Sequence, residues 1–107
     1  ADLYETMGHR VKRTRQVLTS PIVDVIQSSG MDSFDLASID IEGLEQEVLE
    51  ALFDSGIFPR MLICETALYA PRLSDATKCP ALIRWISSFG YSVYADTFVN
   101  TIFVHQQ

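Results

Sequence analysis

Apolar side chains recur with two different spacings along the middle of the chain. Residues 34–41 carry apolar side chains on both faces, as expected of a strand buried between helices. Residues 43–55 then repeat apolar side chains at helical spacing, up to the helix stop Gly56. Residues 61–65 form a second apolar run with strand character. The pattern therefore predicts a strand, an acidic turn, a helix and a second strand in succession.

The flanking segments continue this alternation. Before the central segment, residues 9–18 are predicted to form an edge strand, and a helix is predicted from Ser20 as N-cap and Pro21 to its stop at Gly30. After it, a helix is predicted at residues 76–89, with Pro80 in its first turn, and strands are predicted at 91–95 and 101–105. Strands that alternate with helices favour right-handed crossovers and a parallel sheet. The chain is thus predicted to be one α/β domain spanning residues 1–107, with a mostly parallel sheet, helices on both faces and a C-terminal antiparallel hairpin.

Composition and charge narrow the possible partners. The chain holds 14 acidic and 8 basic residues, and this balance disfavours nucleic acid. No apolar stretch approaches the roughly 20 residues that a membrane helix needs, and the first residues do not resemble a signal peptide. Cys64 and Cys79 are expected to be buried free thiols. We therefore expect a cytoplasmic protein with neither a membrane nor a nucleic-acid partner.

One basic cluster stands out against this acidic balance. It consists of Arg10, Lys12, Arg13 and Arg15. The cluster is predicted to be a solvated edge, and binding to a phosphate or an acidic partner is the alternative.

Three carboxylates follow the two central strands. Asp40 and Glu42 are two residues apart, so an extended segment points both side chains to one side. Glu65 ends the next strand, and adjacent parallel strands lie about 4.8 Å apart. Such a cluster can bind a divalent cation, hold a sugar hydroxyl or supply a general base of raised pKa. The alternative is that Asp40 and Glu42 only stabilise the start of the following helix. Glu45, on that helix, is expected to face water.

The segment around these acids resembles the signature of the FkbM family of methyltransferases. Residues 38–45 (SIDIEGLE) match its Asp-x-Glu-Gly-x-Glu pattern at the end of a strand. Residues 48–49 supply the Val-Leu that follows on the helix. A second strand that ends in Glu65, and the final strands of the chain, fit the same family. The likeness extends from about Val11 onward.

The resemblance implies a partial Rossmann-like fold, the second half of a class I methyltransferase that methylates a hydroxyl with S-adenosylmethionine. Asp40 would be the catalytic or substrate-orienting residue, and Glu42 would support it in the catalytic site. Glu65 would bind the hydroxyl of a small substrate. Tyr69, on the polar loop that follows, is a further expected substrate contact. No metal is expected.

The chain lacks the glycine-rich half of that fold. Its five glycines are isolated, and no G-x-G-x-x-G turn is present to cradle the methyl donor. Ser38 also stands where the family commonly has Lys. The chain is therefore expected to be a methyltransferase fragment or remnant that is not active alone. The alternative is a non-enzymatic binding or assembly module, and a homodimer is expected because the strand at residues 36–41 would otherwise expose its edge.

Overall fold

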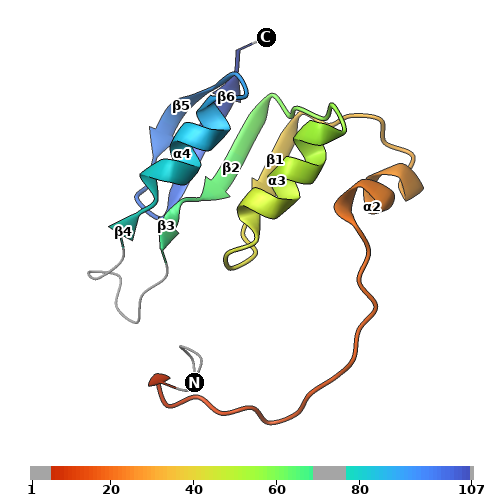
Figure 1. Cartoon of the computed structure of the whole chain (residues 1–107), viewed down its shortest axis with the longest axis vertical. Helices are drawn as coiled ribbons and strands as arrows, with labels where there is room; N and C mark the ends of the chain where they lie inside the picture. The colour runs from red at the N-terminus through yellow and green to blue at the C-terminus, as the bar shows by residue number, and fades with distance from the viewer. Residues whose placement is uncertain (1–5, 69–76, 107) are drawn as a thin grey trace.

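Helices and strands alternate through the part of the chain that the computed structural model describes, residues 6–68 and 77–106 (Figure 1). In chain order the elements are α2 (Ile22–Ser28), β1 (Leu36–Ile39), α3 (Glu45–Asp54), β2 (Met61–Glu65), β3 (Ala67–Leu68), β4 (Thr77–Lys78), α4 (Pro80–Ser87), β5 (Tyr91–Asp96) and β6 (Asn100–His105). The predicted α/β class is confirmed.

The longer strands form an open, mixed sheet in the order β1-β2-β6-β5. β1 and β2 are parallel, with Ile39 opposite Cys64. β6 lies antiparallel to both β2 and β5, so the predicted terminal hairpin is confirmed. A mostly parallel sheet is not confirmed, because the hairpin inserts its last strand between β2 and β5 and makes both of those pairings antiparallel.

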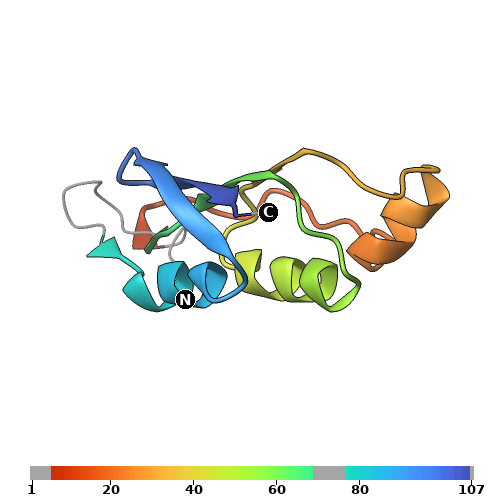
Figure 2. The ribbon, with the colours of Figure 1, turned by 90° about the horizontal axis from the view of Figure 1, so that it is seen from above.

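Helices α3 and α4 both pack on one face of the sheet (Figure 2). β2 lies beside β1, and β5 lies further along in the same direction. Two right-handed crossovers that advance in one direction place their helices on the same side of a sheet. α2 lies beyond the β1 end of the sheet and contacts α3. The prediction of helices on both faces is therefore not confirmed for the described residues.

An aromatic cluster centred on Phe53 joins α3 to α4 and to the sheet. The centroid of the Phe53 ring lies 5.8 Å from that of Trp85 on α4 and 4.7 Å from that of Phe89, just after this helix. Tyr91 on β5 stacks on Phe53 at 5.6 Å, and its hydroxyl donates to the carbonyl oxygen of Pro59 at 2.7 Å. Each such ring pair adds about 0.5–1.5 kcal/mol beyond the burial of its area. The cluster therefore holds both helices against the β5 side of the sheet.

Several predicted boundaries differ from the structure. Residues 9–18 form no strand and are exposed throughout, since no neighbouring strand of the described chain pairs with them. The first helix begins at Ile22, with Pro21 rather than Ser20 at the N-cap position and no side-chain cap. Helix α4 begins at Pro80, because the residues just before it form β4 and pair with β3.

Cys64 and Cys79 are both free thiols, as predicted; Cys64 is buried and Cys79 is half-buried. Within residues 6–68 and 77–106, no helix has the length and apolar character needed to cross a membrane.

Gly90 provides a test of the packing between the α4–β5 turn and β6. Its φ is +91°, and a Cβ at this position would lie 3.1 Å from Nε2 of His105. The same nitrogen hydrogen-bonds the carbonyl oxygen of Phe89 at 2.9 Å, so the ring is not free to move aside. We expect Gly90→Ala to lower the free energy of unfolding by about 1 kcal/mol or more, measured by urea denaturation.

Gly56→Ala is the matched control. Gly56 has a similar φ of +77°, but the space around its Cβ position is open. Its replacement therefore carries the backbone strain without the steric contact, and we expect a smaller loss of stability. Equal losses in the two variants would show that the contact with His105 has no effect.

Candidate functional site

The candidate site lies at the carboxyl ends of β1 and β2. Ile39 and Cys64 face each other in the parallel pair, and both side chains are buried. Successive side chains of a strand point to opposite faces. The next residues, Asp40 just beyond β1 and Glu65 at the end of β2, lie at this edge of the sheet, and the structure brings their carboxylates together.

A tight turn follows Asp40 and leads into α3. Glu42 and Gly43 both have left-handed backbone, with φ of 56° and 105°, which is uncommon for a residue such as Glu42. Glu45 stabilises the turn, because its carboxylate accepts hydrogen bonds from the backbone N–H groups of Ile41 at 3.2 Å and Gly43 at 3.0 Å. The expectation that Glu45 faces water is wrong: these bonds hold it at 6 % exposure.

Three carboxylates converge at this edge of the sheet. One oxygen from each of Asp40, Glu45 and Glu65 lies within 4.8 Å of the other two. Asp40 is exposed, Glu65 is half-buried and Glu45 is buried. Oxygen atoms at this spacing are the kind of ligand set that a hard divalent cation accepts, although exposed acidic groups are also common without an ion.

The cluster raises the pKa of Glu65 from its usual 4.5 to about 7. The largest cause is a hydrogen bond with the side chain of Asp40, followed by partial burial and then by repulsion from Asp40, Glu42 and Glu45. A hydrogen bond between two carboxyl groups requires a proton on one of them, so the Asp40–Glu65 pair retains a proton up to near-neutral pH. Such a pair can accept or release a proton near pH 7.

Cys64 lies close to the cluster but is not a nucleophile. Burial raises the pKa of its thiol to about 12, and the negative charges of Glu45 and Glu65 add to this shift. The thiolate is the reactive form of cysteine. Because the thiol stays protonated at neutral pH, Cys64 acts as a core residue.

A second polar cluster, which the sequence did not predict, lies where β2 and β6 meet the β3–β4 pair. Lys78 on β4 donates to Oγ1 of Thr66 at 2.8 Å and forms a 2.7 Å ion pair with Asp96. The hydroxyl oxygens of Thr66 and Thr101, both buried, lie 2.6 Å apart. These contacts fasten the β3–β4 pair to the sheet beside Glu65.

The structure does not bring all predicted site residues to one point. Asp40 and Glu65 meet, whereas Glu42 is exposed, lies outside the three-carboxylate cluster and acts on Glu65 through its charge. Tyr69 lies outside the described residues. Glu45 is the cluster member that the sequence interpretation missed, and its place as the last acid of the Asp-x-Glu-Gly-x-Glu motif was the available signal.

The pairing of Asp40 with Glu65 makes a direct prediction. Asp40→Asn keeps the size of the side chain and removes its charge. We expect the pKa of Glu65 to fall from about 7 toward its usual 4.5, followed by NMR of the Glu65 carboxyl carbon. Glu47→Gln is the control, since Glu47 is exposed on α3 outside the cluster, and should leave the Glu65 pKa unchanged. A Glu65 pKa that stays near 7 in Asp40→Asn would contradict the pairing.

Comparisons with protein-family models, with curated protein sequences and with solved structures found no match for this chain. The resemblance to the FkbM family therefore depends on the motif at residues 38–45 and on the elements around it.

Proposed function

We propose that this chain is an FkbM-like methyltransferase half-fold whose acidic edge receives the hydroxyl of an acceptor substrate, with the Asp40–Glu65 pair as the proton acceptor. The observation that carries the proposal is the meeting of the Asp40 and Glu65 carboxylates at the ends of β1 and β2, and their hydrogen bond is the largest cause that raises the pKa of Glu65 to about 7. A general base works best when its pKa lies near the working pH. An ordinary surface carboxylate has a much lower pKa and is a weaker base.

The arrangement of the strands supports the same proposal. The resemblance implies a strand that ends in the acidic motif, a second strand that ends in Glu, and two final strands. β1, β2, β5 and β6 follow in this order, with β1 parallel to β2 and β5 paired with β6. A partial Rossmann-like half-sheet therefore accounts for the topology and the motif together.

The four acids have different roles in this proposal. Glu65 takes the proton: the O–H bond of the acceptor breaks, its electron pair stays on the oxygen, and the proton bonds to the carboxylate. Asp40 orients the hydroxyl and sets the pKa of Glu65. Glu45 fixes the turn through two backbone N–H groups, and Glu42 adds negative charge that makes Glu65 more basic.

The S-adenosylmethionine that the resemblance implies does not fit the described residues by themselves. β1 is an edge strand. No further strand in residues 6–68 and 77–106 lies along its outer edge to close that side of the site. The turn that follows β1 carries acids and a single glycine, Gly43, which does not form a glycine-rich cradle. We therefore assign binding of the methyl donor to residues that this sequence does not contain, and assign the acceptor side to this chain.

A non-enzymatic assembly module is the second candidate. The observation that favours it is the outer edge of β1, which has no partner strand in the described part of the chain and on which Leu36 is 54 % exposed. Unpaired edge strands are templates for association. The edge ends beside Asp40 of the carboxyl pair, so the two candidates are separated by their readouts: hydroxyl binding for the acceptor site and oligomeric state for the module.

Hydroxyl-bearing small molecules test the acceptor site. Sugars, polyols and phenols, added above pH 7 and followed by amide NMR, are expected to shift the signals of residues 40–45 and of Glu65. Their O-methyl counterparts should not, because they have no proton to donate. The shifts should weaken as the pH falls through about 7, since Glu65 then becomes protonated.

Two variants and one ligand complete this test. Glu65→Gln should abolish the shifts, whereas Glu50→Gln, which changes an exposed carboxylate of α3, should preserve them. The proposed acceptor site is contradicted if ethers shift the signals as strongly as hydroxyl compounds do. It is also contradicted if no hydroxyl compound shifts them. Calorimetry with millimolar S-adenosylmethionine is expected to give no binding heat, and micromolar affinity would contradict the assignment of the donor site elsewhere.

A further inference from the structure

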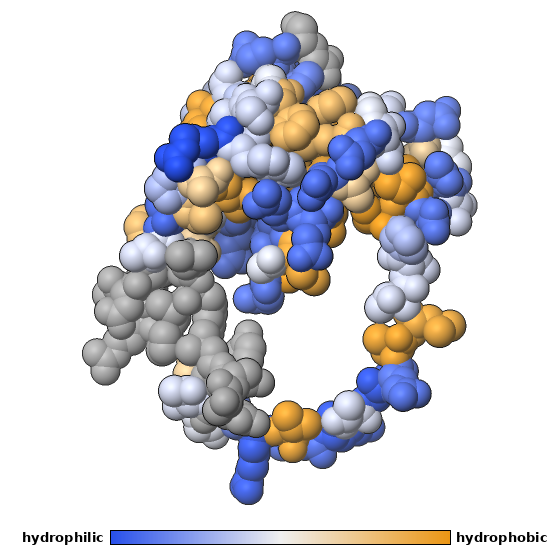
Figure 3. All heavy atoms as spheres, in the orientation of Figure 1, coloured by the Kyte–Doolittle hydropathy of each residue, from blue (hydrophilic) through white to orange (hydrophobic). Residues whose placement is uncertain are grey.

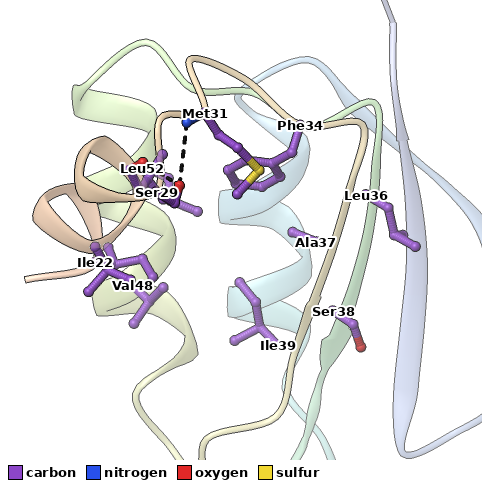
Figure 4. A pocket seen from close by; sticks show the side chains of 12 residues that line it. Ile22, Ser29, Met31, Phe34, Leu36, Ala37, Ser38, Ile39, Val48 and Leu52 are labelled. Carbon is purple, nitrogen blue, oxygen red and sulfur yellow. Dashed lines mark hydrogen bonds between the residues drawn. The ribbon is translucent and has the colours of Figure 1, made fainter.

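An apolar groove of about 520 Å³ runs along the unpaired edge of β1, between this strand, α2 and α3 (Figure 4). Ala37 and Ile39 of β1 point into it, toward Ile22 of α2 and Val48 of α3. Within the described residues, no strand pairs with this edge of β1. The groove therefore combines space for apolar side chains with unpaired backbone groups, which are the two features that bind an added strand.

The segment at residues 10–20, here called the arm, is suited to such a groove. It belongs to no helix or strand, is exposed along its whole length and runs clear of the folded body (Figures 1 and 3). Val17 and Leu18 are 75 % and 103 % exposed. The arm also carries four of the chain's 8 basic residues and no acid. Val17 and Leu18 thus offer adjacent apolar area that would be removed from water by contact with another surface.

The arm and the β1 edge are complementary in antiparallel orientation. Along the arm the basic residues come first, and Val17 and Leu18 follow. Along the edge the apolar groove comes first, and the exposed acids Asp40 and Glu42 follow. Antiparallel pairing brings opposite charges together and apolar surfaces together, whereas parallel pairing would separate them.

The two apolar residues of the arm also match the two faces of the edge. Neighbouring side chains of a strand point to opposite faces. One of Val17 and Leu18 therefore enters the groove, and the other covers Leu36, whose side chain lies on the opposite side of β1 from Ala37 in Figure 4 and is 54 % exposed.

We propose that a second copy of this chain supplies the added strand, so that each protomer places its arm antiparallel to β1 of its partner in a two-fold dimer. Residues 19–21 alone separate Leu18 from Ile22 on the groove wall. Docking on its own β1 would require the arm to reverse within this short connection, whereas the arm of a partner enters without a reversal. Two identical contacts close the assembly. The dimer does not depend on the proposed acceptor chemistry.

Charge reversal on each side of the contact tests this dimer in the full chain. Sedimentation equilibrium is expected to show a dimer at micromolar concentration that weakens with added salt, because salt screens the charges. Arg13→Glu combined with Arg15→Glu should weaken dimerisation by roughly tenfold or more, and Glu42→Lys should do the same. All three positions are exposed, so the fold should persist. A mixture of the two variants should recover part of the lost affinity as a heterodimer, since the introduced Glu residues of one arm then lie near the introduced Lys of the partner edge.

Asp35→Lys is the control for orientation. It changes an exposed acid at the amino end of β1, where antiparallel pairing places the uncharged end of the arm, and it should have little effect. A monomeric wild-type chain would overturn the proposal, including a monomer whose arm amides are protected from hydrogen exchange by its own β1. A dimer that tolerates both charge reversals, or that responds more to Asp35→Lys than to Glu42→Lys, would also overturn it.

Discussion

The parallel pairing of β1 with β2, with Ile39 opposite Cys64, is the constraint on which the candidate site depends. A register shift of one residue would turn every side chain of a strand to the opposite face. Asp40 would then point toward the core, and Ile39 would lose its buried position. Because the core holds Ile39 and Cys64 inside, the next residue of each strand is held outside. The packing of Ile39 and Cys64 in the core therefore sets where Asp40 and Glu65 meet at the ends of the two strands.

The fold accommodates these crowded acids in two different ways. Glu45 is buried as an acceptor of two backbone N–H groups, so its charge stabilises the turn at the start of α3. Asp40 and Glu65 have each other as partners, and their repulsion is reduced by a retained proton. The first arrangement makes a structural acid, and the second makes a group that titrates near neutrality. The same cluster thus serves both the shape of the turn and its chemistry.

Local periodicity was sufficient to predict much of the fold. The runs at β2 and at the β5–β6 hairpin are apolar and sharply bounded, and Pro80 fits only the start of a helix. The mixed sheet was harder to predict, because the pairing of β6 with β2 depends on contacts between residues that are distant in the sequence. The β3–β4 pair is too short to show a period, and its anchor Lys78 depends on the register of other strands.

The candidate site was predictable to a similar degree. The spacing of Asp40 and Glu65 predicted their meeting once the strands were parallel neighbours. The burial of Glu45 depends on the left-handed backbone of Glu42, which the sequence does not reveal. The arm shows a further limit: its alternating pattern resembles an edge strand, yet within the described chain it has no sheet to join.

The most direct test of the carboxyl pair is an NMR titration of the side-chain carboxyl carbons in the wild-type chain. One carboxyl group of the Asp40–Glu65 pair should titrate with a pKa of about 7, assigned to Glu65. If every Asp and Glu of the chain instead titrates below about 5, as unperturbed carboxyl groups do, the two side chains do not share a proton, and the proposed site is contradicted.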